Sequence, residues 1–319
     1  MIVTLTPNPS HDRTVALPAA LVRGAVQRAD SVTSQAGGKG VNISRASVAA
    51  GIPSIAVLPA PAEDPFVLEL LSAGIDCRAV PITGTLRVNI TISEPDGTTT
   101  KLNSPGPTVD AEVLSGLTES LLRRAASADW LVLAGSLPPG APVTWYAELV
   151  EVLRGHGARV AVDTSEGPLH ALVEGLPASA PQLMKPNGEE LASFTGADPD
   201  LLESDPHAAA KAARTLVDRG VETVLATLGA NGAVLVNAQG AWHATPPPTT
   251  VVSTVGAGDS SLFGYLLGEI RQRTPAQRLA LAVAYGSAAA GLPGTTIPHP
   301  TQVTPELVSV RDLDLTQGG

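Results

Sequence analysis

The sequence predicts an α/β fold with a mainly parallel central sheet, helices on both faces and a small β-sheet lid. Strand-like apolar runs alternate with helical stretches over most of the chain, a pattern typical of a parallel sheet covered by helices. Two segments, about 13–34 and 86–103, interrupt this alternation with short strand-like runs and glycine turns. At 319 residues the chain can bury a substantial core. We therefore expect a single domain, residues 1–319, with a lid formed by the two segments inserted in it.

The elements of the central sheet follow one another from the N-terminus. Residues 2–5 are strand-like, and residues 130–134 read as a buried strand that leads into a turn at 135–140. The remaining expected strands are 159–162, 182–185, 223–227 and 233–236, and the expected helices are 143–153, 188–194, 208–219, 258–270 and 275–290. Ligands of such a fold bind at the carboxyl ends of the strands, so the site is expected at that edge.

The lid is expected to be formed by the strand-like residues 15–34 and 86–101. The sequence Pro95-Asp96-Gly97-Thr98 is a hairpin signal within the second segment. Exposed lid strands offer unpaired edges, which makes a homodimer through the lid a possible assembly. The run Pro246-Pro247-Pro248 is expected to be a stiff connector within the domain.

Composition excludes several classes of function. The net charge is −10 and aromatic residues are 3% of the chain, which argues against nucleic acid as a partner but leaves a small anionic substrate open. No apolar run approaches the roughly 18 residues of a membrane span, and the strand-like start carries no export signal, so we expect a cytoplasmic protein without a membrane partner. The single cysteine, Cys77, excludes an intramolecular disulfide.

The stretch from Thr254 to Ser260 combines glycines with a carboxylate at the start of an expected helix. Gly256 and Gly258 let the backbone approach a polyanion, and the free N–H groups of a first helical turn stabilise negative charge. A carboxylate repels phosphate, so Asp259 indicates a base that takes a proton from an attacking hydroxyl. The alternative is that Asp259 is only a helix N-cap.

Several motifs in a fixed order resemble the PfkB family of carbohydrate kinases, also called the ribokinase-like family. The motifs are 37–42 (GGKGVN), 185–190 (KPNGEE) and 255–259 (VGAGD). The further motifs 4–12 (TLTPNPSHD), 86–89 (LRVN) and 135–140 (GSLPPG) resemble the phosphosugar branch of that family, to which the 1-phosphofructokinases belong. The resemblance spans residues 2 to about 297 and implies the ribokinase-like fold.

The resemblance also implies site residues. The catalytic set is Asp259 with Gly256, Ala257 and Gly258. The substrate-binding set is Asp12, Gly37, Gly38, Lys39, Asn42, Arg87, Lys101 and Ser136. The ATP-binding set is Lys185, Asn187, Thr227, Gly229, Gly232, Gly258 and Ser287. Asn187 and Glu190 are implied to hold Mg²⁺ through water, which suits an ion that keeps several waters.

Each of these residues also has an ordinary structural interpretation. Asp12 could cap a turn, Glu190 could be a helix-start carboxylate, and the glycines before Asn42 could form a simple turn. That cluster is not a Walker A loop, because Gly40 follows Lys39 where Ser or Thr is required. Arg87 is the main candidate for the substrate phosphate, since a guanidinium holds phosphate by two parallel hydrogen bonds, although an exposed strand cation is usually solvated.

The implied activity is ATP-dependent phosphorylation of fructose 1-phosphate at its 6-hydroxyl. Phosphorylation of tagatose 6-phosphate or fructose 6-phosphate at the 1-hydroxyl is the enzymatic alternative, and a sugar-phosphate sensor without catalysis is the alternative of another class. Two positions depart from the family pattern. His11 stands where an apolar residue is common, and we expect its side chain to face solvent. Ser253 stands where relatives often carry an Asp that helps hold a monovalent cation, so the sequence argues against potassium dependence.

Overall fold

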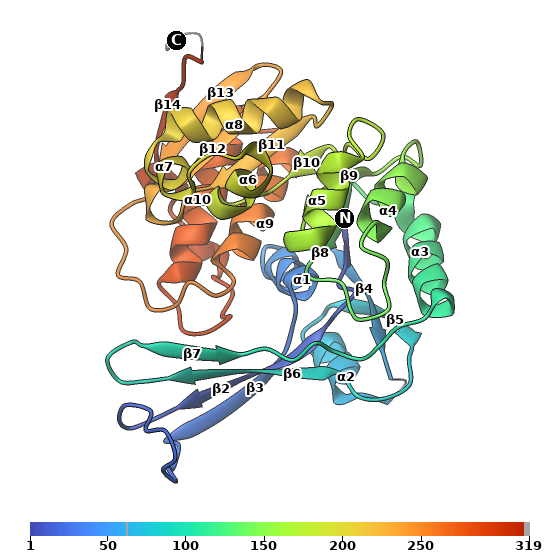
Figure 1. Cartoon of the computed structure of the whole chain (residues 1–319), viewed down its shortest axis with the longest axis vertical. Coiled ribbons are helices and arrows are strands. Elements are labelled where there is room, and N and C mark those ends of the chain that lie inside the picture. The colour runs from blue at the N-terminus through green and yellow to red at the C-terminus, as the bar shows by residue number, and fades with distance from the viewer. Residues whose placement is uncertain (62, 316–319) are drawn as a thin grey trace.

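The computed structural model describes residues 1–61 and 63–315. Within them the central element is a ten-stranded sheet with the order β14-β13-β12-β11-β10-β9-β8-β1-β4-β5 (Figure 1). The strands from β5 to β11 in this order run parallel, and β12, β13 and β14 are antiparallel. Their bounds are β1 (Ile2–Leu5), β4 (Ser54–Ala60), β5 (Asp76–Pro81), β8 (Trp130–Ala134), β9 (Arg159–Asp163), β10 (Leu183–Met184), β11 (Thr223–Thr227), β12 (Ala233–Asn237), β13 (Gly240–Thr245) and β14 (Ser309–Asp312).

Helices cover both faces of this sheet, as the alternating pattern predicts. Successive strand residues point to opposite faces, so Ile2 packs with the helices on one side while Val3 and Leu5 pack with those on the other. The first face carries α1 (Lys39–Ala49), α9 (Ala257–Ile270) and α10 (Pro275–Ala290). The second carries α3 (Ala111–Ala125), α4 (Trp145–Leu153), α5 (Glu166–Glu174), α6 (Gly188–Thr195), α7 (Pro199–Ser204) and α8 (Pro206–Asp218). The helix α2 (Pro65–Ser72) packs against β4 and β5 through Phe66 and Leu70. The predicted α/β fold is therefore confirmed.

Two glycines bring α9 and α10 into close contact. A Cβ at Gly264 would lie 2.5 Å from the carbonyl oxygen of Leu281, and one at Gly268 would lie 3.0 Å from the Cα of Arg278. At Gly264 only glycine leaves room, since real Cβ atoms do not come so near to backbone atoms, and at Gly268 a Cβ would force its neighbour to shift. The two helices therefore pack backbone against backbone.

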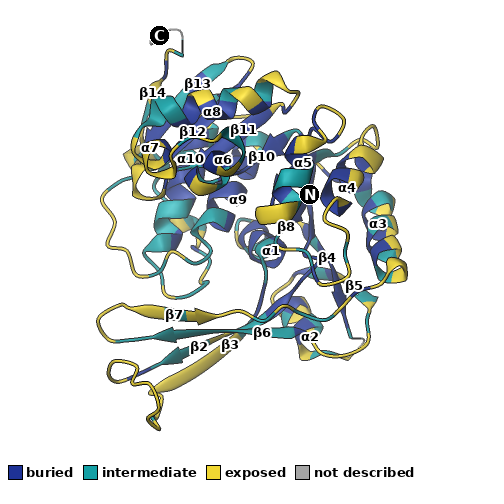
Figure 2. Cartoon of the chain, viewed as in Figure 1, coloured by how far each residue is buried: buried dark blue, intermediate teal, exposed yellow. Residues whose placement is uncertain are grey.

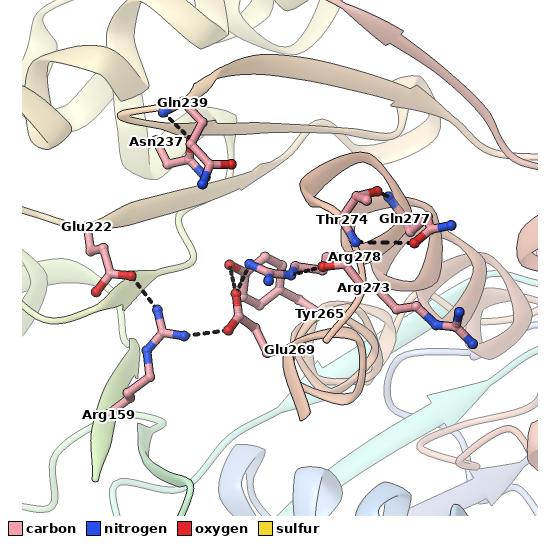
Figure 3. A network of polar contacts seen from close by, with 10 residues as sticks. All are labelled: Arg159, Glu222, Asn237, Gln239, Tyr265, Glu269, Arg273, Thr274, Gln277 and Arg278. Carbon is pink, nitrogen blue, oxygen red and sulfur yellow. Dashed lines mark hydrogen bonds and ion pairs between the residues drawn. The ribbon is translucent and has the colours of Figure 1, made fainter. Parts of the chain in front are cut away.

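A charged network fixes the C-terminal end of α9 (Figure 3). Glu269, whose side chain is 8% exposed, accepts hydrogen bonds from Arg159 and Arg278 and, at 3.0 Å, from the hydroxyl of Tyr265. Arg159 also pairs with Glu222 and lies 4.5 Å above the ring of Trp130. The network thus ties α9 to the start of β9 and to α10.

A second sheet of four strands, with the order β3-β2-β6-β7, extends along one side of the molecule (Figure 1). Its strands are β2 (Ser10–Ala16), β3 (Ser31–Gly37), β6 (Arg87–Ser93) and β7 (Thr99–Leu102), so the first strand begins before residue 13 and residues 17–30 contain no strand. The predicted turn between β6 and β7 is present, because the backbone N–H of Glu94 donates to the carbonyl of Thr98 at 2.9 Å. Figure 2 shows that this sheet is far less buried than the central one.

Other elements differ in extent from the sequence expectation. The strand expected at 182–185 is only Leu183–Met184, and the helix expected from residue 143 begins at Trp145. Among the described residues no helix is long and apolar enough to cross a membrane. Cys77 is a free, buried cysteine.

Candidate active site

The candidate residues gather at the carboxyl ends of neighbouring parallel strands. The chain leaves β9 at Asp163 and reaches Lys185 one residue after β10, and the loop after β1 leads into β2 and Asp12. Parallel strands end at one edge of a sheet, so their polar terminal residues meet there. The start of α9 lies at the same edge, since Lys185 Nζ is 3.4 Å from the position that a Cβ on Gly258 would occupy.

The first turn of α9 presents backbone donors and a buried carboxylate. Gly256 is the N-cap, with a left-handed φ of 79° that favours glycine, and no side chain caps the turn. Asp259 is the third helical residue and not the cap, which removes the alternative interpretation of this residue. Because the N–H groups of a first helical turn have no partner within the helix, this end of α9 can bind an anion.

Asp259 is almost fully buried and contacts two residues of α1. Asn42 Nδ2 donates to its Oδ2 at 2.8 Å, and Lys39 Nζ lies 3.8 Å from its Oδ1. Burial raises the pKa of the Asp259 carboxyl above its usual value, although Lys39 opposes this shift. A carboxyl whose pKa is raised is a better proton acceptor when it is ionised.

Asp163 lies beside Asp259 and was not predicted from the sequence. Its Oδ1 is 3.1 Å from Lys39 Nζ and its Oδ2 is 3.3 Å from Lys185 Nζ, and its side chain is 1% exposed. Burial alone would raise the pKa of Asp163, but the charges of Lys185 and Lys39 hold it below its usual value. The signal for Asp163 was its position at the end of a buried strand, but the sequence pattern predicted that strand only to residue 162.

Asp12 faces the glycine turn before α1. Ser10 Oγ donates to its Oδ1 at 2.7 Å, and Asn89 Nδ2 donates to the same oxygen at 3.1 Å from the paired position on β6. A Cβ on Gly37 would lie 2.1 Å from Asp12 Oδ2, so any larger residue there would displace this carboxylate. Burial raises the pKa of Asp12. Ser10 and Asn89 were not identified as site residues, although both stand within motifs used to identify the family.

Arg87 begins β6 and lies close enough to Asp12 for the two charges to interact. Its Nη1 donates to the carbonyl of Ser104 at 3.2 Å, while its Nε is buried without a hydrogen-bond partner. Burial lowers the pKa of the guanidinium, with Asp12 acting in the opposite direction. An unpartnered buried N–H costs about 1–3 kcal/mol, and an anionic ligand would satisfy it.

Further buried polar atoms without a partner occur around Asp12 and the start of α1. These atoms are Thr6 Oγ1, Asn8 Oδ1, Asn42 Oδ1 and Asn89 Oδ1. All are oxygens that accept hydrogen bonds from hydroxyl groups. Buried polar groups are normally satisfied, and the hydroxyl groups of a bound ligand would satisfy these acceptors.

A pocket of about 770 Å³ lies at the first turn of α9. Gly258 lines it, and so do five other predicted nucleotide-site residues: Asn187, Thr227, Gly229, Gly232 and Ser287. Lys185 is not part of its lining but lies beside Gly258. The segment 246–249, expected only to be a stiff connector, also lines the pocket. A separate cavity of about 320 Å³, lined by Gln35 and Arg45 among others, contains none of the predicted residues.

Asn187 and Glu190 form a reciprocal cap at the start of α6. Asn187 Oδ1 accepts from the Glu190 backbone at 2.7 Å, and Glu190 Oε2 accepts from the Asn187 backbone at 2.9 Å. Burial raises the pKa of Glu190. The described residues contain no group of three or more His, Cys, Asp or Glu side chains arranged for a metal. The oxygen set nevertheless suits Mg²⁺, which takes few protein ligands and completes its shell with water and phosphate.

The structure does not bring every predicted residue into contact. Lys101 on β7 and Ser136 after β8 are both exposed, and neither has a hydrogen bond or ion pair to the other candidates within the described part of the chain. The expectation that His11 faces solvent is wrong. Its Nε2 lies 3.1 Å from Asp64 Oδ1 and its ring meets Phe66 edge-on, because alternation along β2 turns His11 away from Asp12 and toward α2.

Comparison with known proteins places this site in context. Residues 8–302 match the model of the pfkB family of carbohydrate kinases. The chain is 36% identical over 308 residues to a 1-phosphofructokinase of Rhodobacter capsulatus, with 95% of this chain and 94% of the relative covered. Phosphofructokinase-2 from Escherichia coli, solved with substrates and products, superposes with a TM-score of 0.86 at 28% identity, covering 94% of this chain and 96% of that one. Arabidopsis thaliana ribokinase with ribose and ATP shares the fold, with a TM-score of 0.72 at 18% identity over 94% and 96% of the two chains.

Proposed function

The chain belongs to the pfkB family of carbohydrate kinases, and on that premise we propose that it transfers the γ-phosphoryl group of ATP to the 6-hydroxyl of fructose 1-phosphate. Sugar-phosphate kinase activity follows from the family and from relatives that carry it along their whole length. The choice of fructose 1-phosphate is supported by relatives of 31–36% identity named 1-phosphofructokinase.

The observation that carries the proposal is the position of Asp259. This carboxylate lies in the first turn of a helix that offers free N–H groups to phosphate, and Asn42 links it to the region of unpartnered hydroxyl acceptors. In the proposed reaction Asp259 accepts the proton of the attacking sugar hydroxyl. The amides at the start of α9 stabilise charge on the transferred group.

The remaining side chains bind and orient the two substrates. Asp12 and Asn42 hold sugar hydroxyls. Arg87 uses its free Nε to hold the phosphate that the sugar already carries. The nucleotide occupies the pocket lined by Thr227, Gly229 and Ser287, with Lys185 near its phosphates. Mg²⁺, held through water by Asn187 and Glu190, would neutralise phosphate charge when bound.

The four-stranded sheet has a polar face for the substrate and an apolar face for assembly. Asp12, Arg87 and Asn89 share one face, and we assign this sheet the role of a lid over the sugar.

The other face of this sheet carries apolar side chains. They are Val15, Ile90, Ile92, Val32 and Leu102, and the side chains of Val32 and Leu102 are 57% and 55% exposed. A second copy of the chain would cover this face in a homodimer. Size-exclusion chromatography with light scattering should give a dimer that Val32→Glu converts to monomer.

The experiment that tests the function is ADP release with a panel of sugars. Fructose 1-phosphate should give the highest kcat/KM, above fructose 6-phosphate, tagatose 6-phosphate and unphosphorylated fructose. A preference for one of the 6-phosphates would reassign the substrate within the same reaction. Binding of sugar phosphate without any ADP release would instead identify a sensor and overturn the proposal.

A further inference from the structure

Asp163 binds two lysines that come from separate elements. Lys39 is the first residue of α1, and Lys185 follows β10, yet their Nζ atoms lie 3.1 Å and 3.3 Å from the two oxygens of this one carboxylate. Asp163 is 1% exposed and Lys185 is 5% exposed, so these charges are largely removed from water. Charges are buried only when they are paired, and here one carboxylate is shared by two ammonium groups.

One carboxylate neutralises only one of the two ammonium groups, so a net positive charge remains beside the start of α9. Lys185 lies next to Gly258, and Lys39 lies 3.8 Å from Asp259, farther than its 3.1 Å contact with Asp163. The two lysines therefore flank the turn at which phosphate charge must be stabilised. Without Asp163, Lys39 would be free to form its close ion pair with Asp259 instead.

We propose that Asp163 is a positioning residue for phosphoryl transfer: it holds Lys39 and Lys185 beside the first turn of α9 and keeps Lys39 from pairing closely with Asp259. This inference rests on the proposed function, because it requires Asp259 to act as the proton acceptor. Asp163 itself touches neither substrate in this proposal. It acts through the two lysines and through its own charge.

The charges around Asp259 give this role a signature in the pH profile. Lys39 from α1, Lys185 after β10 and Asp163 on β9 are the charged groups that act on Asp259, and Asn42 is its hydrogen-bond donor. The negative charge of Asp163 raises the pKa of Asp259, and the positive charge of Lys39 lowers it. In the pH profile of kcat, activity falls at low pH as Asp259 becomes protonated, and this part of the profile is its acid limb. Removing Asp163 should therefore move the acid limb to lower pH, while removing Lys39 should move it to higher pH.

The experiment compares Asp163→Asn and Lys39→Met with the wild-type enzyme at saturating ATP and phosphosugar. Asp110→Asn serves as the matched control, since Asp110 is an exposed N-cap of α3 and asparagine caps equally well. For Asp163→Asn we expect kcat to fall about 10- to 100-fold, since misplacing active-site groups by about 1 Å can cost as much as 100-fold. The KM for phosphosugar should change little, and the acid limb should shift to lower pH. The control should match the wild type in both quantities.

Two results would overturn the inference. Wild-type kcat in Asp163→Asn would remove the residue from the mechanism, and a lower kcat with an unmoved acid limb would leave it a purely structural role. Should Asp163→Asn not fold, as circular dichroism would reveal, Lys39→Met decides, because an acid limb that does not move to higher pH contradicts the arrangement. Failure of the proposed function is distinguishable, since the wild-type enzyme would then release no ADP with any sugar phosphate.

Discussion

Asn42 donates a hydrogen bond of 2.8 Å from Nδ2 to Oδ2 of Asp259, which joins the start of α1 to the start of α9 across 217 residues of sequence. The glycine turn before α1 also faces Asp12, since Gly37 leaves room for that carboxylate. One bond therefore connects the region assigned to the sugar with the turn assigned to the phosphoryl group.

Replacing Asp259 by asparagine should abolish proton acceptance while leaving the shape of the site intact. We expect the turnover measured by ADP release to fall by about 100-fold or more, as for the loss of a positioned base. Binding of the phosphosugar, measured by calorimetry, should change little. Asp218→Asn, an exposed substitution on α8, is the control, and equal turnover of the two variants would exclude Asp259 as the base.

Arg87→Ala should weaken binding of the phosphorylated sugar specifically. The loss of hydrogen bonds to a charged group costs about 1.5–3 kcal/mol, so the KM for phosphosugar should rise by roughly 10- to 100-fold. The KM for ATP should be unchanged. Arg123→Ala is the matched control, because Arg123 is an exposed arginine on α3, outside the four-stranded sheet. An equal effect of the two substitutions would contradict the role of Arg87.

Gly37→Ala tests the contact between the glycine turn and the lid strand. The added Cβ would lie 2.1 Å from Asp12 Oδ2, so the carboxylate must move. Overpacking of this kind costs about 1–3 kcal/mol, and the KM for sugar should rise by roughly 10-fold while the KM for ATP stays the same. Gly291→Ala meets its nearest atom at an ordinary 3.5 Å and should leave both constants unchanged. An unaltered sugar KM in Gly37→Ala would place Asp12 outside the sugar site.

Glu269→Gln should destabilise the fold without touching the site. It leaves the guanidinium groups of Arg159 and Arg278 without their buried carboxylate, for which we expect a loss of about 3 kcal/mol in the free energy of unfolding measured in urea. Glu119→Gln breaks an exposed pair with Arg123, in which both side chains are 63% exposed. That control should lose less than about 0.5 kcal/mol. Similar losses in both variants would mean that the network of Figure 3 contributes no more than a surface pair.

Activity should not depend on potassium. Ser253 offers a neutral hydroxyl that already accepts a hydrogen bond from the backbone of Val255 at 3.2 Å, in place of the cation-binding carboxylate that the family resemblance implies at this position. Turnover should therefore be the same in sodium, potassium or tetramethylammonium chloride at equal ionic strength. Activation by potassium alone would contradict this prediction.

The fold could be predicted because its strands are locally unambiguous. The apolar run Trp130–Ala134 has the predicted bounds, and α10 covers the predicted residues 275–290. The strand β10 is shorter than expected because Pro186 and the start of α6 follow it closely, and only two of its residues pair with β9 and β11. The strands β4 and β5 were not identified individually, although they pair in parallel at the edge of the sheet.

The candidate site was predicted only where motif and position agree. Asp259, Asn42 and Asp12 stand within motifs, and the structure brings each of them to the same edge of the sheet. Asp163 escaped prediction because its importance comes from its contacts with Lys39 and Lys185, which the fold alone brings together. His11 was misjudged because its partner, Asp64, lies 53 residues away in the sequence.

The glycine contacts between α9 and α10 have a consequence for the design of inhibitors. Both helices contribute to the wall of the 770 Å³ pocket, through Ser261 on α9 and through Val283, Gly286 and Ser287 on α10. Because the two helices pack backbone against backbone at Gly264, the shape of this wall depends on that contact. A compound designed for the pocket would therefore meet one wall set by helix packing and another formed by the proline-rich segment 246–249.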